Sequence, residues 1–119
     1  MKRGCRLLAM LCVAILLVGT VQVYAATSLT ATHKATYIKG RFEYASAGNQ
    51  LMVKLYFSEK HTETGQVYSS NCSATSNGAN TIVSKSRNAD TGYNYTKLDV
   101  YAYLNGAQYS QLLNCPQES

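Results

Sequence analysis

Hydrophobic and polar residues alternate along three segments of the chain, residues 36–44, 51–57 and 98–104. A period of two places successive side chains on opposite faces of a strand, so each segment is predicted to be a half-buried β-strand. Residues 27–34, 67–73 and 81–87 show a weaker form of the pattern and are further strand candidates. The residues expected on the buried faces are Ile38, Gly40, Phe42 and Tyr44, then Leu51, Val53, Leu55 and Phe57, then Leu98, Val100, Ala102 and Leu104.

Turn-forming residues separate these segments. Asn105-Gly106 is a favoured pair for a two-residue type I′ hairpin turn, because both positions take positive φ. In the register that this turn sets, Tyr109 and Leu113 join the buried face. The expected pairs are Leu104 with Ala107, Ala102 with Tyr109, Val100 with Gln111 and Leu98 with Leu113. Short strands joined by turns predict an all-β fold, a small antiparallel β-sandwich, and an immunoglobulin-like strand order is one arrangement that fits.

Residues 1–25 have the three-part pattern of a secretory signal. Lys2, Arg3 and Arg6 form a basic start, an apolar stretch covers residues 7–18, and smaller residues lead up to Ala25. The alternative is a permanent membrane anchor, but a spanning helix needs about 20 apolar residues and this stretch is shorter. We therefore predict a signal helix that is removed after Ala25. A single β-sandwich domain, residues 26–119, is then secreted or associated with the cell envelope.

The net charge of the chain mostly belongs to its leader. The 119 residues include 11 basic and 6 acidic side chains, a formal charge of +5. Removing the three basic residues of the leader leaves eight against six, a charge of +2. Phosphate binding needs a clustered basic surface, so we do not expect nucleic acid as a partner.

Two of the four cysteines remain after cleavage, because Cys5 and Cys12 lie in the leader. An exported chain with an even number of cysteines predicts a disulfide, here between Cys72 and Cys115. Two reduced thiols, in a poorly oxidising envelope, are the alternative. The bridge would close a long loop and add about 4 kcal/mol to the free energy of unfolding.

The sequence contains no nucleophile elbow, no metal-ligand spacing and no phosphate-binding glycine loop. We accordingly predict no enzymatic activity, no metal and no cofactor. His61 is expected in an exposed loop, and His33 on the solvent face of a strand. Glu43 and Asp99 both point outward on the strand pattern, which leaves a small hydrolase as a minor hypothesis because a glycosidase needs two opposed carboxylates.

Tyrosine is the remaining unusual feature, with ten residues in a chain that has no tryptophan. A tyrosine side chain offers a broad contact area with a polar tip, so an outward tyrosine face can bind a glycan or a protein at the cell surface. The alternative is that these residues only stabilise the strands. The hypothesis is a secreted, non-enzymatic binding or envelope-associated module. The candidate binding surface consists of Tyr56, Tyr93, Tyr95, Tyr101 and Tyr103.

Three segments carry resemblances to two known groups of proteins. Residues 92–106 (GYNYTKLDVYAYLNG), together with the leader and the Ser/Thr/Tyr-rich strands, resemble small secreted all-β proteins of Gram-positive bacteria. Residues 67–71 (VYSSN) and the Tyr/Ala-rich stretch 101–109 are similar to lactococcin 972-type bacteriocins. The chain lacks the tryptophans of that family and adds a charged strand at 39–44. This second resemblance implies an alternative function, a secreted antibacterial protein.

Overall fold

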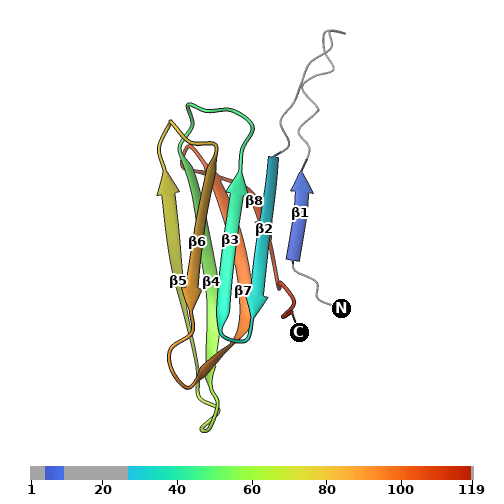
Figure 1. Ribbon diagram of the computed structural model, residues 1–119, viewed down its shortest axis with the longest axis vertical. Coiled ribbons are helices and arrows are strands. Elements are labelled where there is room, and N and C mark those ends of the chain that lie inside the picture. Colours follow the sequence, from blue (N-terminus) through green and yellow to red (C-terminus); the bar gives the residue numbers. More distant parts are fainter. Residues whose placement is uncertain (1–4, 10–26, 119) are drawn as a thin grey trace.

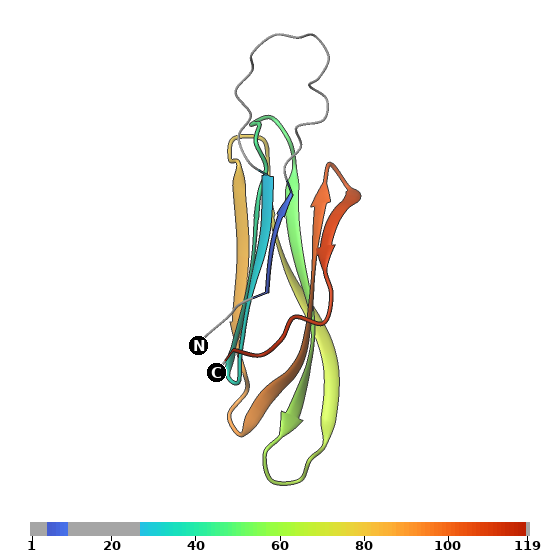
Figure 2. The same cartoon turned by 90° about the vertical axis from the view of Figure 1, so that its right-hand side faces the viewer.

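The computed structural model describes residues 5–9 and 27–118, and every regular element in these ranges is a β-strand. Two antiparallel sheets pack face to face, as the two views in Figures 1 and 2 show. The predicted all-β sandwich is therefore confirmed. The strands are β1 (Cys5–Ala9), β2 (Thr27–Lys34), β3 (Tyr37–Glu43), β4 (Leu51–His61), β5 (Val67–Ser76), β6 (Ile82–Asn88), β7 (Tyr93–Leu104) and β8 (Ala107–Leu112).

The order of strands is immunoglobulin-like with one strand moved. The first sheet has the order β2-β3-β6, extended by β1 beside β2, and the second has the order β5-β4-β7-β8. Counted from β2, the first, second and fifth strands (β2, β3 and β6) form one sheet. The fourth, third, sixth and seventh strands (β5, β4, β7 and β8) form the other. In a constant-type immunoglobulin domain the fourth strand belongs to the first sheet. Here that strand, β5, pairs with β4 instead.

Strand β1 lies inside the predicted leader, which we expected to be helical. Residues 5–9 instead pair antiparallel with residues 27–31 of β2, so the prediction of a helix is wrong for these five residues. The backbone groups of a sheet edge accept a further strand, and β2 would otherwise be such an edge. The predicted cleavage after Ala25, and the rest of the leader, lie outside the described residues.

The predicted alternation is confirmed in the three strongest segments, which become β3, β4 and β7. The weaker candidates become β2, β5 and β6. Leu104 and Tyr44 are partly buried and pack against the core. The core consists of Leu29, Ala31, Ile38, Phe42, Leu51, Val53, Leu55, Phe57, Val83, Tyr95, Leu98, Val100, Ala102, Leu112 and Cys115.

Gly40 of β3 packs closely against side chains of the second sheet. A Cβ atom at this position would lie 2.9 Å from Cγ1 of Val100 and 3.0 Å from Cδ1 of Leu55. Both distances are shorter than van der Waals contact between carbon atoms. The inward glycine in the alternating pattern thus marks the place where β3 packs directly over β4 and β7.

The predicted hairpin turn between β7 and β8 is confirmed. Asn105 has φ 51° and Gly106 has φ 85°, as a type I′ turn requires, and Leu104 pairs with Ala107.

The register beyond this turn differs from the prediction by one residue. Tyr103 pairs with Gln108 and Ala102 with Ser110, so Tyr109 is an extra residue, a β-bulge. Its ring packs against Phe42, with the ring centres 5.7 Å apart.

The bulge reverses the alternation along the rest of β8. Leu112 is therefore buried and pairs with Val100, where the prediction had Gln111. Leu113 is 47% exposed, so its predicted burial and its pairing with Leu98 are wrong.

The predicted disulfide between Cys72 and Cys115 is also wrong. Cys72 is on β5 and pairs with Leu55, while the N–H of Cys115 donates to the carbonyl of Leu98 on β7. Three strand spacings, about 14 Å, separate these positions across the sheet. A disulfide needs Cα atoms within about 7 Å. Cys72 is a free thiol.

Candidate functional site

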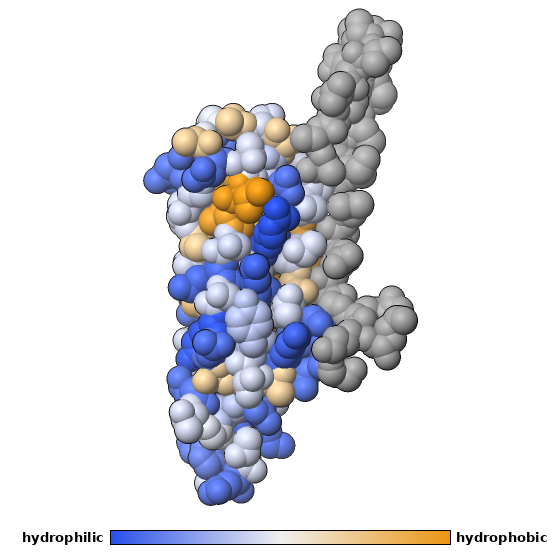
Figure 3. Space-filling model, in the orientation of Figure 1, coloured by the Kyte–Doolittle hydropathy of each residue, from blue (hydrophilic) through white to orange (hydrophobic). Residues whose placement is uncertain are grey.

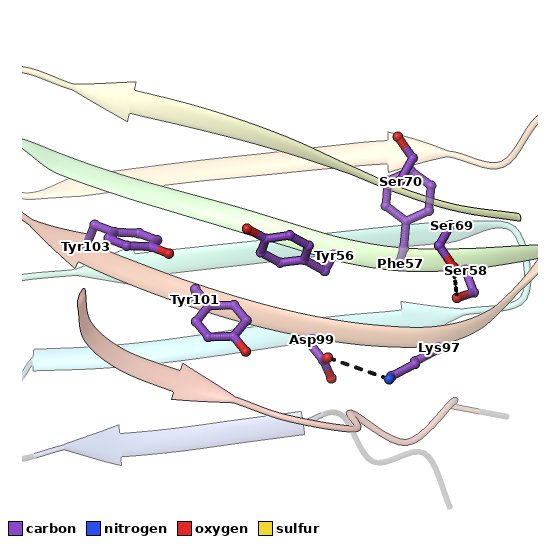
Figure 4. Close-up of a pocket in the computed structure, with 9 residues that line it drawn as sticks. All are labelled: Tyr56, Phe57, Ser58, Ser69, Ser70, Lys97, Asp99, Tyr101 and Tyr103. Carbon is purple, nitrogen blue, oxygen red and sulfur yellow. Dashed lines mark hydrogen bonds and ion pairs between the residues drawn. The ribbon is translucent and has the colours of Figure 1, made fainter. Parts of the chain in front are cut away.

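An open groove of about 450 Å³ lies on the outer face of the second sheet (Figure 4). It contains three of the five tyrosines of the predicted binding surface, and both polar and aromatic side chains line it. The lining residues are Tyr56, Phe57 and Ser58 of β4, Ser69 and Ser70 of β5, and Lys97, Asp99, Tyr101 and Tyr103 of β7.

The aromatic part of the groove is held by ring contacts across the two central strands. The rings of Tyr56 and Tyr101 meet edge to face, with their centres 5.4 Å apart and their planes at 80°. Figure 4 shows Tyr103 farther along β7 on the same face. The ammonium of Lys54 lies 5.1 Å from the centre of the Tyr56 ring. The Tyr56 phenol raises the pKa of Lys54.

The other end of the groove is polar. The ammonium of Lys97 lies 4.0 Å from Oδ2 of Asp99, and the backbone N–H of Asn114 donates to Oδ1 of the same carboxylate at 2.7 Å. The hydroxyls of Ser58 and Ser69 are 2.8 Å apart. The groove therefore offers hydroxyl groups and a paired charge next to the rings of Tyr56 and Tyr101.

Tyr95 does not belong to this surface. Its side chain is fully buried, and its ring meets Phe57 edge to face with centres 5.4 Å apart. The cause is a second bulge: Lys97 pairs with Ser58 and Tyr95 with Glu59, so Thr96 is an extra residue in β7. The bulge turns Tyr95 inward, and its predicted place on the binding surface is wrong.

Tyr93 lies apart from the groove, at the other end of β7. Its ring contacts His61, with centres 4.9 Å apart, and Tyr68, with centres 5.5 Å apart. Nδ1 of His61 also accepts the backbone N–H groups of Glu63 and Thr64, which closes the turn after β4. The prediction of one surface made by all five tyrosines is therefore wrong, and the groove retains Tyr56, Tyr101 and Tyr103.

A buried ionic cluster lies between the sheets near Tyr95. Glu59 of β4 is fully buried and forms an ion pair with Arg87 of β6. Arg87 also donates to the hydroxyl of Tyr95 at 2.7 Å, and its guanidinium lies over the ring of Phe57 at 4.5 Å. Asp90 lies 3.5 Å from the same guanidinium.

Tyr68 of β5 completes this cluster. Its hydroxyl lies 2.6 Å from Oδ2 of Asp90 and 2.5 Å from Oε1 of Glu59, so both carboxylates share its single proton. Hydrogen bonding to Asp90, and then to Glu59, raises the pKa of Tyr68 well above its usual value. Burial acts to lower the pKa of Arg87, but hydrogen bonds to Glu59 and Tyr95 outweigh it and the pKa is raised.

Within the cluster the Glu59 side chain has no exposure, whereas the side chains of Arg87 and Asp90 are 26% and 55% exposed. Sequence reasoning missed the cluster, although a signal was present. Glu59 continues the inward alternation of Leu55 and Phe57 along β4, two residues beyond the end of the predicted strand at Phe57.

Glu43 and Asp99 lie on opposite faces of the molecule. Glu43 is on the outer face of the first sheet beside Arg41, and Asp99 is on the outer face of the second. The sheets themselves pack about 10 Å apart, which exceeds the separation of a retaining pair before the outward side chains are counted. The hydrolase hypothesis built on these two carboxylates is wrong.

The predicted exposure of His33 is also wrong, because its side chain is buried. It alternates inward with Leu29 and Ala31 along β2. Nδ1 of His33 donates to the carbonyl of Cys115 at 2.8 Å, and the N–H of Glu118 donates to the carbonyl of His33. These bonds hold the C-terminal segment against β2.

Within residues 5–9 and 27–118, no group of three or more His, Cys, Asp or Glu side chains is arranged to hold a metal ion. No helix in this part of the chain is long and apolar enough to cross a membrane. Comparisons with protein-family models, curated proteins and solved structures give no match to this chain. Both resemblances in the sequence therefore stay predictions.

Proposed function

We propose that this protein is a secreted or envelope-associated binding module that contacts its partner through the outer groove of the second sheet. The single observation that carries the proposal is the groove itself, with Tyr56, Tyr101 and Tyr103 grouped on an outer sheet face. The proposal involves no catalytic step.

The arrangement of the rings supports a role in binding. Tyrosine buries a large area with few rotatable bonds, so ordering it on binding costs little entropy. The contact between Tyr56 and Tyr101 fixes the two rings before a partner arrives. Preorganisation of this kind raises affinity because less freedom is lost on association.

In the described part of the first sheet, the outward side chains of its strand β3 are Tyr37, Lys39, Arg41 and Glu43, with one tyrosine among them. Figure 3 shows the outer face of the first sheet as largely hydrophilic, with a small hydrophobic area toward its upper end. Ile82, 40% exposed, lies at the start of β6 in this sheet. The second sheet is therefore the better candidate for a contact surface. The predicted export signal in residues 1–25 supports a partner at the cell surface.

Binding to the surface of the cells that make the protein tests this proposal. Purified protein carrying Tyr101→Ser and Tyr103→Ser is expected to bind at least about tenfold more weakly than the unaltered protein, since two contact rings are lost. Tyr37→Ser is the matched control, because Tyr37 is a partly exposed tyrosine of β3 in the other sheet. Equal binding by the double variant and the control would refute the role of the groove.

A further inference from the structure

We infer that the ligand of the outer groove is a neutral glycan chain of more than one sugar unit. This inference rests on the proposed function and specifies its partner. It follows from the pattern of side chains around the tyrosines, from their charge and from the length of the groove.

Hydrogen-bonding side chains flank the tyrosines on both sides. On β5, Asn71 pairs with Tyr56 and Ser69 with Ser58, and both β5 side chains are exposed. On β8, Gln111 pairs with Tyr101 and is exposed as well. The sheet thus presents its tyrosines between a hydroxyl and an amide group on β5 and an amide group on β8.

A sugar ring matches this pattern. Its C–H groups form apolar faces that pack against aromatic rings, and its hydroxyl groups project around the edge. Amide and hydroxyl side chains can both donate and accept hydrogen bonds, so they suit hydroxyl groups, which do the same. The positions of Asn71 and Gln111 on the strands next to Tyr56 and Tyr101 are where such an edge would lie.

The charge of the groove favours a neutral ligand. Lys97 and Asp99 are paired with each other, and Lys54 is held over the ring of Tyr56. Binding of an acidic polymer requires clustered cationic side chains that neutralise the charge of the polymer. The groove does not present such a cluster among its described residues.

The groove is also extended. Its lining on β7 runs from Lys97 to Tyr103, a span of six residue steps along the strand, or about 20 Å. Its volume of about 450 Å³ falls in the range of small-molecule sites, but it is open along the sheet. An open groove of this length accommodates consecutive units of a chain better than one isolated ring.

Calorimetric titration of the full-length chain with neutral tetrasaccharides tests the inference. The probes are the β-1,4-linked tetramers of glucose, xylose and N-acetylglucosamine and the α-1,4-linked tetramer of glucose. We expect saturable binding of at least one, weakened about tenfold or more by Tyr56→Ala and by Tyr101→Ala. Tyr37→Ala, on the other sheet, should leave the affinity within about twofold.

Three results would overturn the inference. The first is that none of the four tetrasaccharides binds at concentrations up to about 10 mM. The second is binding that both groove variants retain. The third is binding only of heparin fragments, an acidic polymer, with loss of affinity at high salt.

Failure here can be separated from failure of the proposed function. If the tetrasaccharides do not bind but Tyr101→Ser with Tyr103→Ser still abolishes attachment to cells, the groove binds a partner of another class. If the double variant attaches as the unaltered protein does, the proposed function fails as well.

Discussion

Glu59 shows how this small sandwich accommodates a carboxylate in its interior. An unpaired buried charge costs several kcal/mol, and the attraction of a partner offsets this cost only where further hydrogen bonds are made. Here Arg87 supplies the opposite charge, Tyr68 donates to the carboxylate, and the ring of Phe57 covers the guanidinium. The stability of the site therefore depends on all members being present together.

Replacing one charge of this pair should be costly. Glu59→Gln keeps the shape of the side chain but removes the buried counter-ion of Arg87 and leaves only the more exposed Asp90, 3.5 Å away. We expect the free energy of unfolding to fall by about 3 kcal/mol, measured by urea denaturation. Glu43→Gln is the control, because the ion pair of Glu43 with Arg41 is exposed and should contribute under about 1 kcal/mol. Equal losses in the two variants would contradict this view of the cluster.

The shared proton of Tyr68 predicts a dependence of stability on alkaline pH. Hydrogen bonds to Asp90 and Glu59 raise the pKa of Tyr68 above the usual value near 10. The folded chain then keeps this proton at pH values where the unfolded chain loses it. The contribution of Tyr68 to the free energy of unfolding is therefore complete below about pH 10 and falls as the pH rises further.

Chemical denaturation across pH 9–11 measures this effect. The unaltered chain should lose stability progressively above about pH 10. The Tyr68→Phe variant should lose less stability over the same range, because phenylalanine has no hydroxyl proton to titrate. Tyr56→Phe serves as the control, since Tyr56 lies outside the cluster. An identical pH slope in the Tyr68 variant and the unaltered chain would rule out a contribution from Tyr68.

At the scale of elements, the alternating pattern predicted which residues face the core, and it failed beyond two bulges. A period-two argument assumes that paired strands contain equal numbers of residues. Thr96 and Tyr109 each add one residue to a strand, and every side chain beyond them changes face. The pattern gave no sign of these insertions, because the segments after them are too short to show the changed alternation.

The bulge at Tyr109 is testable through two adjacent leucines. Leu112→Ala should lower the free energy of unfolding by about 2–3 kcal/mol, because Leu112 is buried. Leu113→Ala should change it by under about 0.5 kcal/mol, because Leu113 is 47% exposed. Thermal or urea denaturation of the two variants decides the register, and the regular hairpin without a bulge predicts the opposite order.

Contacts between distant segments were the part that the sequence did not reveal. The pair Glu59 and Arg87 is separated by 28 residues, and the packing of β6 of the first sheet against β4 and β5 of the second brings them together. The predicted disulfide failed for the same reason. Counting cysteines says nothing about strand order, and the order β5-β4-β7-β8 puts Cys72 and Cys115 at opposite edges.

At the scale of the whole molecule, strand β1 and the groove lie on different sheets. Strand β1 joins the first sheet beside β2, whereas the groove is on the second sheet, as the edge-on view in Figure 2 shows for the two layers. Removal of residues 1–25 would therefore leave the groove intact and expose the edge of β2. Exposed edges are places where strands of other molecules can pair.

Amide hydrogen exchange should report the loss of β1. In the chain that begins at Ala26, amides of residues 27–31 should exchange faster than in the full-length chain, because β1 pairs with these residues. Amides of β3 are the internal control, since β3 lies between β2 and β6 in both forms. Unchanged exchange in β2 would show that β1 does not protect this edge.

The extra residue at Thr96 also bears on how this gene can change. In most of β7, loss of one codon would exchange core and surface positions along the remainder of the strand. Around the bulge, the same loss joins Tyr95 directly to Lys97 and leaves both facing as they do now, with Tyr95 inward and Lys97 outward. Strand β7 thus contains one place where a single-codon deletion is nearly silent, and variation in length among descendants of this gene should collect there.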